Sequence, residues 1–217
     1  ILKENYIDAI EILLIHKDKT KFLIILISLY YKMGRDREAN LLLNDTRDKL
    51  KNDKNFYNYL GIRYLYEGNF ENGWEYYEFR GSKLTNILKD IKLWNGEEIH
   101  NKSIVVFNEQ GLGDTIQFSK YLLSLRKISN EVSFVVPKKI LNLFNPNLDK
   151  IKIETNDTII NKTYDYKITL GSLIKFFYKD KYKIDDNLLF KDQINITNWN
   201  KKLDHTKPNV GIVWSGS

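Results

Sequence analysis

The sequence predicts an α plus α/β protein, in which helical hairpins are followed by a parallel-sheet domain. Two observations lead to this prediction: a 34-residue periodicity within residues 20–80, and short apolar runs that alternate with helix-like stretches after residue 102. Residues 1–100 carry 16 basic and 16 acidic side chains, whereas residues 101–217 carry 18 and 12, so the whole net charge of +6 lies in the second half. We expect two domains, the second more favourable to anions, although a lysine-rich solvated surface explains the charge equally well.

Composition excludes several classes of protein. Apolar residues make up 42% and charged residues 29% of the 217 residues, which is typical of a folded chain. The absence of cysteine excludes disulfides and cysteine-ligated zinc and fits a reducing, cytoplasmic location. The three histidines lie far apart in the sequence, so we expect no metal site. No apolar run approaches the ~18 residues of a membrane span, so we expect no transmembrane segment.

The first half repeats itself. Tyr30 and Tyr64, Gly34 and Gly68, and Ala39 and Gly73 are each separated by 34 residues. This spacing predicts helix pairs at 20–33 and 36–49 and again at 54–67 and 70–80. Gly68 permits a left-handed turn between helices, and small residues at 39 and 73 allow close helix approach. Generic helical hairpins that happen to align are the alternative.

The second copy of the repeat resembles the tetratricopeptide family, whose unit is a helix–turn–helix of this length. The resemblance rests on Tyr57-x-x-Leu60-Gly61-x-x-Tyr64-x-x-x-Gly68-Asn69-Phe70-x-x-Gly73-x-x-x-Tyr77. Residues 6–13 are interpreted as the second helix of an earlier unit, so residues 1–80 form a degenerate array. The resemblance implies that the array binds a protein or peptide partner. Because repeats need neighbours to bury their faces, we expect further repeats before Ile1.

Strand-like runs dominate the second half. Four of them are expected, at Ile104–Phe107, Val132–Val136, Ile151–Glu154 and Tyr166–Leu170, with helices at 115–127 and 138–144 between them. Alternation of this kind predicts βαβ units and a parallel sheet over residues 102–209, joined to the repeats by a connector at 81–101. A further run begins at Val210, so residues 210–217 are expected to start another domain.

The loop Asn108-Glu109-Gln110-Gly111-Leu112-Gly113-Asp114 follows the first of these strands, where ligands of parallel sheets bind. Two glycines let the backbone turn sharply and approach a ligand, and the start of the next helix offers N–H groups to an anion. Asp114 stands where a helix N-cap is expected, and capping alone explains an aspartate there. The spacing is neither a Walker loop nor a dinucleotide fingerprint.

Three blocks resemble bacterial tetratricopeptide proteins that carry a glycosyltransferase-like domain. They are Gly73-Trp74-Glu75-x-Tyr77-Glu78-Phe79-Arg80, Trp94-Asn95-Gly96-Glu97 and Glu109-Gln110-Gly111-Leu112-Gly113-Asp114-Thr115-Ile116-Gln117-Phe118. Leu170-Gly171-Ser172-Leu173 and the segment from Val210 continue the match. The domain is similar to heptosyltransferases, with two facing Rossmann-like halves in the GT-B fold, of which residues 102–209 are the first.

The resemblance also implies roles for individual residues. Asp114 is the candidate general base, and we add Glu109 as a neighbour that shares this task. Candidate substrate-binding residues are Gln110, Gly111, Leu112, Gly113, Gln117, Gly171 and Ser172. No metal and no further cofactor are implied, because the co-substrate is a nucleotide-sugar bound mainly by the second half of the fold. We therefore expect residues 1–217 to transfer no sugar by themselves.

Two functions follow as alternatives. The first is transfer of a sugar to a glycan, glycolipid or protein acceptor, with the repeats binding a protein. The second is a non-catalytic scaffold in which only the repeats function. Nucleic-acid binding is not expected, because arginine is scarce and no known module is present. The cation-rich aromatic segment 175–183 leaves peripheral membrane contact open, but a helix that packs its aromatic side chains inward explains it better.

Overall fold

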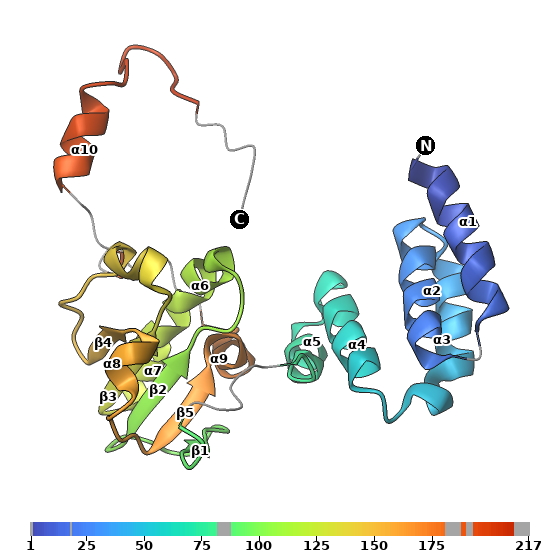
Figure 1. Cartoon of the computed structure of the whole chain (residues 1–217), viewed down its shortest axis with the longest axis horizontal. Coiled ribbons are helices and arrows are strands. Elements are labelled where there is room, and N and C mark those ends of the chain that lie inside the picture. The colour runs from blue at the N-terminus through green and yellow to red at the C-terminus, as the bar shows by residue number, and fades with distance from the viewer. Residues whose placement is uncertain (1, 18, 82–87, 181–187, 190–192, 211–217) are drawn as a thin grey trace. The chain divides into compact units, whose positions relative to one another are not determined.

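The computed structural model describes all residues except 1, 18, 82–87, 181–187, 190–192 and 211–217, which are drawn as a grey trace in Figure 1. The chain divides into two compact units. We call residues 1–85 and 172–179 the helical unit, and residues 86–171 and 180–217 the sheet unit. Among the described residues, no helix is both long and apolar enough to cross a bilayer.

The helical unit is built from five consecutive helices: α1 Leu2–Ile15, α2 Thr20–Lys32, α3 Asp36–Leu50, α4 Lys54–Tyr66 and α5 Phe70–Tyr77. The last four confirm the helix ranges expected from the 34-residue period. Neighbours pack in pairs, α1 on α2, α2 on α3 and α4 on α5. Asp53 caps α4 through its carboxylate, which accepts the backbone N–H of Asn55 at 2.8 Å.

Both hairpin turns are closed in the same way. Gly34 and Gly68 follow α2 and α4 with φ of 71° and 80°, the left-handed conformation that glycine tolerates best. After each glycine the backbone N–H of the next residue turns back: Arg35 N donates to Tyr30 O at 2.9 Å, and Asn69 N to Tyr64 O at 2.8 Å. The left-handed turn expected at Gly68 is therefore confirmed, and its hydrogen bond recurs 34 residues apart.

Small residues bring the helices close together. Ala39 on α3 is fully buried in a cluster with Leu26, Ile27 and Tyr30 of α2. In the second hairpin, a Cβ on Gly61 of α4 would lie 2.6 Å from the backbone nitrogen of Tyr77 on α5. Only a residue without a side chain fits there, so the glycine sets the distance between these two helices.

A segment from much later in the chain completes the helical unit. Arg80, only 8% exposed, donates from Nη1 to Tyr77 O at 3.2 Å and to Glu78 Oε1 at 2.7 Å. Its Nη2 donates to Ser172 Oγ at 3.0 Å. Lys175 Nζ pairs with Glu75 Oε2 at 2.8 Å. Residues 172–179 are thus tied to the end of α5 by buried as well as exposed contacts.

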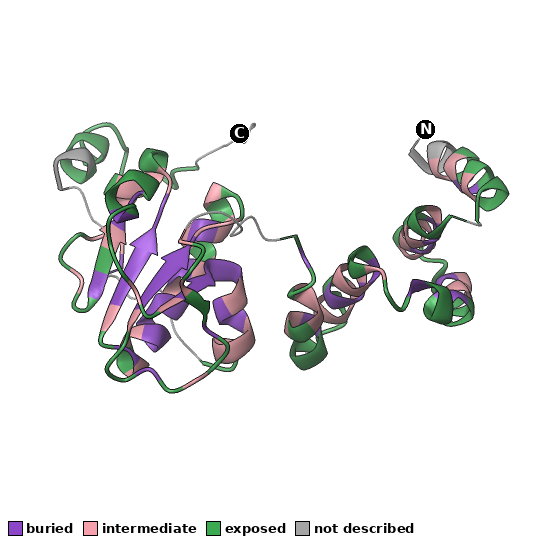
Figure 2. Cartoon of the chain, turned by 60° about the horizontal axis from the view of Figure 1, so that its bottom comes forward, coloured by how far each residue is buried: buried purple, intermediate pink, exposed green. Residues whose placement is uncertain are grey.

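The sheet unit contains five parallel strands in the order β1-β5-β2-β3-β4: β1 Lys92–Leu93, β2 Ser103–Phe107, β3 Glu131–Val135, β4 Ile151–Glu154 and β5 Tyr166–Thr169. The expected parallel sheet and its four longer strands are confirmed, with shifts of one residue at some ends. The strands run through the buried, purple interior of the unit in Figure 2, as their continuous apolar sequences require. The short edge strand β1 was not expected.

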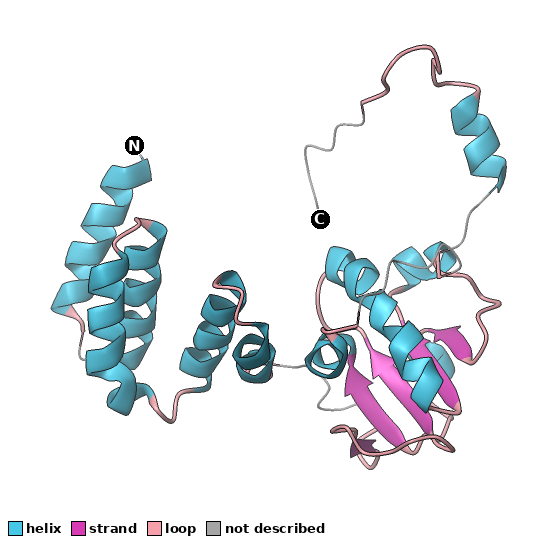
Figure 3. Ribbon diagram, turned by 180° about the vertical axis from the view of Figure 1, so that it is seen from behind, coloured by secondary structure: helices cyan, strands magenta, loops and turns pink. Residues whose placement is uncertain are grey.

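Helical segments connect the strands: α6 Leu112–Phe118, a 3₁₀ turn Ser119–Tyr121, α7 Leu122–Ile128, a 3₁₀ helix Lys138–Leu143 and α8 Asn156–Ile159. Two more helices follow the last strand, α9 Leu170–Phe177 and α10 Gln193–Asn200, and α9 passes from the sheet unit into the helical unit at residue 172. Figures 1 and 3 view the sheet from opposite sides and show α8 over one face and α7 over the other. The expected strand from Val210 and the end of the 175–183 segment lie outside the described residues, apart from Val210 itself, which is exposed.

Candidate functional site

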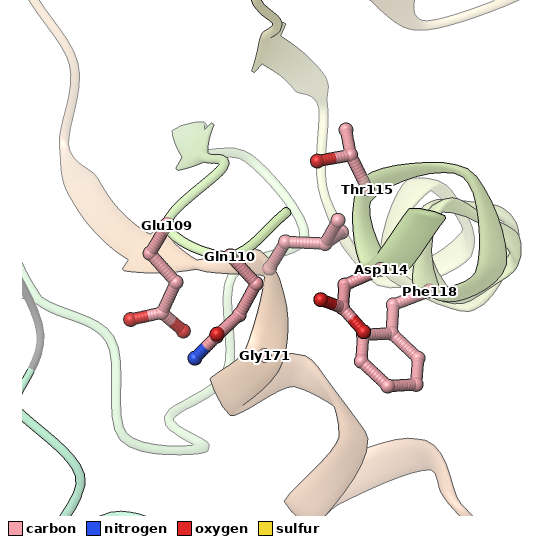
Figure 4. A pocket seen from close by; sticks show the side chains of 7 residues that line it. Glu109, Gln110, Asp114, Thr115, Phe118 and Gly171 are labelled. Carbon is pink, nitrogen blue, oxygen red and sulfur yellow. The ribbon is translucent and has the colours of Figure 1, made fainter. Parts of the chain in front are cut away.

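The strand order reverses at β2. From β2 the chain proceeds outward through β3 and β4, and then returns to place β5 on the other side of β2. Ligands of open parallel sheets bind outside the carboxyl ends of the strands at such a reversal. Here the loop after β2 meets the start of α9 (Leu170–Phe177), which follows β5 directly. Together they line a narrow pocket formed by Glu109, Gln110, Asp114, Thr115, Phe118, Leu170 and Gly171 (Figure 4).

Backbone hydrogen bonds hold the loop after β2 in place. Asn108 N donates to Val135 O at 3.3 Å and so extends the pairing of β2 with β3. Gly111 O accepts both the backbone N–H and the hydroxyl of Thr115, at 3.0 and 2.9 Å. Thr115 is buried, which fixes the first turn of α6 against the unit. The start of α6 therefore has a defined position.

Asp114 is not the N-cap of this helix, contrary to the sequence prediction. Gly111 is the N-cap, with an extended backbone, and Asp114 is the third helical residue. The Asp114 carboxylate reaches back, and its Oδ2 accepts the Gly111 N–H at 3.2 Å. The helix begins three residues early because the Thr115 hydroxyl and N–H already hold Gly111 O. Asp114 thus still stabilises the helix start, but from inside it.

The glycines also differ from expectation. A sharp turn of the backbone was predicted, yet Gly111 has an extended backbone with a φ of −64° and Gly113 lies within α6. A Cβ on Gly113 would have no atom within 4 Å, and one on Gly111 would make only an ordinary contact of 3.5 Å with Asp114 Oδ2. The fold of the described residues therefore requires neither glycine. Their missing side chains leave open space at the pocket rim.

The structure brings together four of the predicted residues, namely Glu109, Gln110, Asp114 and Gly171. Figure 4 places the carboxylate of Glu109 beside the end of the Gln110 side chain, with Asp114 on the other side of Gln110 next to Phe118. Asp114 Oδ1 has no hydrogen-bond partner in the part of the chain that the structure describes, so this oxygen is available to a ligand.

The other predicted residues do not line the pocket. Gly111, Leu112 and Gly113 lie at the start of α6, between the lining residues Gln110 and Asp114, and Gln117 is exposed one turn further along. Ser172 belongs to the helical unit, where its hydroxyl accepts the hydrogen bond from Arg80. Sequence reasoning missed Thr115, Phe118 and Leu170. Phe118 lies four residues after Asp114, so helical periodicity places the two on one face and could have indicated it.

The Trp94–Glu97 block has a structural task. Trp94 is buried and donates from Nε1 to Glu97 O at 2.8 Å, and Gly96 takes a φ of 95° in the turn. The Glu97 carboxylate accepts Lys92 Nζ at 2.6 Å and Asn95 N at 2.7 Å. The ammonium of Lys92, followed by the backbone N–H of Asn95, lowers the pKa of Glu97 to about 2. These contacts close the turn that follows β1.

Metal ligands are not assembled anywhere in the described ranges: no three carboxylate or imidazole side chains there are placed to hold an ion. The functional groups at the carboxyl edge of the sheet are the carboxylates of Glu109 and Asp114, the side-chain amide of Gln110 and backbone N–H groups. Such groups can bind hydroxyls and accept a proton. The fold combines helices with a parallel five-stranded sheet, and its candidate ligand site lies at the reversal of the strand order.

Comparison with known proteins adds one relative. The chain is 22% identical to "Protein FlbA" of Caulobacter vibrioides over 172 residues, which cover 68% of this chain and 29% of FlbA. The chain thus spans less than a third of that relative's length. No known protein family matches the sequence. No solved structure matches it either.

Proposed function

We propose that this chain is part of a glycosyltransferase of the GT-B type, in which the pocket at the end of β2 holds the acceptor. The observation that carries the proposal is the meeting of the Glu109–Asp114 loop with Leu170–Gly171 at the reversal of strand order. The pocket is too narrow to admit a water molecule, so it cannot enclose a ligand. A site of this form supplies one wall of a cleft, which fits a fold whose substrates lie between two halves.

Asp114 is the proposed general base. Its Oδ2 is held by Gly111 N, which fixes the carboxylate, while Oδ1 has no partner among the described residues. A fixed carboxylate with one open oxygen can accept the proton of a sugar or protein hydroxyl as that hydroxyl attacks the anomeric carbon of a nucleotide-sugar. Positioning of this kind is worth about 10²–10⁴-fold in rate. The side-chain amide of Gln110 can orient the acceptor hydroxyls.

The helical unit is proposed to be a tetratricopeptide array that binds a protein or peptide. Support comes from the recurrence of the same turn 34 residues apart, with Gly34 and Gly68 in the left-handed conformation and matching N–H to carbonyl bonds after them. Ala39 and Gly73, also 34 apart, are both buried at helix contacts. These are the features that let helix pairs stack in register.

Gly113 offers the sharpest test of the acceptor site. A Cβ there touches nothing in the described fold and alanine favours a helix, so Gly113→Ala should leave stability unchanged or raise it by about 0.4–1 kcal/mol. If a substrate approaches this rim, the same methyl group should weaken its binding. We would measure release of nucleoside diphosphate from UDP-, GDP- and ADP-sugars by the longer protein that contains this segment, with thermal unfolding in parallel.

The outcomes separate the two functions. Loss of turnover in a Gly113→Ala protein of unchanged stability supports the acceptor site. A longer protein that consumes none of these donors, or one that is indifferent to both Gly113→Ala and Asp114→Asn, favours the scaffold function instead. Residues 1–217 alone should bind the nucleotide-sugars weakly or not at all, which calorimetric titration checks.

A further inference from the structure

The helical unit contains a second and larger hollow, of about 480 Å³, between α4 and the end of α2. This size lies within the ~300–1,000 Å³ of ordinary ligand pockets. Three tyrosines, an arginine, a lysine and an isoleucine supply most of its character: Tyr31, Lys32, Tyr59, Ile62, Arg63 and Tyr66. The pocket is separate from the one at the end of β2, and the sequence analysis did not single it out.

Arg63 organises the pocket. Its guanidinium carbon lies 3.8 Å from the centroid of the Tyr31 ring and 5.5 Å from that of Tyr66. Its Nε pairs with Glu67 Oε1 at 2.7 Å, one turn along α4, and the side chain is 20% exposed. Glu67 thus neutralises part of the charge of the guanidinium, and Tyr31 covers one face of its plane. Arg63 also hydrogen-bonds the Tyr31 hydroxyl, and its remaining terminal N–H groups can donate, in fixed directions, to an anionic group.

The rim of the pocket is apolar and open. Tyr66 is 84% exposed and Ile62, one turn earlier on the same face of α4, is 51% exposed. Exposed apolar side chains that lie together and are rimmed by polar groups mark sites of protein contact. A flat, apolar guest that lies on the Tyr66 ring beside Ile62 would remove both from water.

Charge narrows the choice of guest. Lys32, at the end of α2, has no ion-pair partner among the described residues. Asp36 is the carboxylate that lines the pocket, and it lies in the first turn of α3, where the helix dipole already favours it. Arg63 is already paired with Glu67, so Lys32 is the cation that favours a negative charge in the guest. The nearby Asp36 disfavours a doubly charged phosphate, which argues for a carboxylate and against a nucleotide.

We propose that this pocket binds a protein segment through one aromatic side chain with an acidic residue next to it, a proposal that rests on the partner-binding function of the helical unit. The aromatic ring stacks on Tyr66 beside Ile62. The neighbouring carboxylate pairs with Lys32 and the terminal nitrogens of Arg63. Recognition of a single aromatic anchor is a common way for a helical surface to select its partner.

The test uses three capped peptides on the whole chain: acetyl-Gly-Glu-Trp-Glu-Gly-amide, the same peptide with leucine for tryptophan, and the same with lysines for both glutamates. Amide chemical shifts are followed by NMR during titration. We expect saturable shifts at Gly34, Ile62 and Tyr66 with the first peptide, and at least fivefold weaker binding of the other two. Uridine monophosphate serves as the nucleotide comparison.

Variants complete the test. Tyr66→Ala and Lys32→Ala, both at exposed positions, should each lower the affinity for the first peptide at least fivefold. Trp199→Ala removes an aromatic side chain that is 60% exposed in the sheet unit and should have no effect. The proposed peptide site would be refuted by equal binding of all three peptides, by tighter binding of uridine monophosphate, or by unchanged peptide affinity in Tyr66→Ala. Saturable shifts elsewhere on α1–α5 would overturn it too, but would leave partner binding by the repeats intact.

Discussion

Gly61→Ala should destabilise the helical unit, although alanine is the better helix former. A Cβ at this position would lie 2.6 Å from Tyr77 N and 2.8 Å from the carbonyl carbon of Tyr76. Comfortable contacts between such atoms need about 3.5 Å, so α4 and α5 must separate by roughly 0.9 Å. Both obstacles are backbone atoms, and no side chain can rotate away to relieve them.

The magnitude follows from two opposing contributions. Gain in helix propensity stabilises Gly61→Ala by about 1 kcal/mol. Overpacking costs about 1–3 kcal/mol. Separation of the helices also disturbs the rings of Tyr57 and Tyr76, which stack with centroids 5.7 Å apart, and aromatic pairs of this kind contribute about 0.5–1.5 kcal/mol. We expect a net loss of about 0.5–3.5 kcal/mol.

Hydrogen exchange measured by mass spectrometry can locate the effect. Amides of α4 and α5 should exchange faster in Gly61→Ala, while those of the sheet unit should not change. Gly113→Ala is the matched control, because it also lies in a helix but meets no atom within 4 Å. Equal or slower exchange of α4 and α5 in Gly61→Ala would show that the helices are not held as close as described here.

Three further predictions concern turns and charges. Gly34→Ala and Gly68→Ala should each cost about 1–2 kcal/mol, because both positions have positive φ, and chemical denaturation of the two variants should show losses of similar size. Asp114→Asn should keep the fold, since its amide oxygen can still accept from Gly111 N, whereas Asp114→Ala should lose about 1 kcal/mol. In the complete glycosyltransferase that we propose, Asp114→Asn should lower turnover about 10²–10⁴-fold. Near-normal turnover would refute the role of Asp114 as general base. Because the pKa of Glu97 falls from 4.5 to about 2 on folding, its contribution to stability is complete above pH 4.5 and is lost as the pH falls toward 2. The difference in unfolding midpoint between wild type and Glu97→Gln should shrink over that range, and a constant difference would argue against the ion pair.

Sequence periodicity predicted the larger helices and strands well, because burial determines how their apolar residues are spaced. The 34-residue spacing of Tyr30 with Tyr64 and of Gly34 with Gly68 gave the helix ranges, since both glycines close turns by the same hydrogen bonds. The run Ile104–Phe107 is buried on both faces of the sheet and reads as a strand for that reason. Even so, β1 was missed, because two exposed residues carry no periodic signal.

Four residues of the candidate site were predicted from the sequence, but the start of α6 and the contact of Ser172 were not. Helix-start preferences pointed to Asp114 as the cap, yet the Thr115 hydroxyl on Gly111 O moves the start of α6 to Leu112. That hydrogen bond depends on Thr115 being buried, which a single sequence does not reveal. Likewise, Ser172 could not be assigned to Arg80, because the two residues are 92 apart in the chain.

The bond from Arg80 to Ser172 has a consequence for folding and for dissection of the protein. The five consecutive helices make local contacts and should form early, but residues 172–179 can join them only after the intervening chain has brought them back. Residues 86–171 of the sheet unit are thus inserted within the helical unit, and residues 180–217 follow it. A fragment ending at residue 81 would leave the guanidinium of Arg80 without the Ser172 hydroxyl and Glu75 without Lys175. Domain boundaries drawn along the sequence alone would cut the helical unit in two.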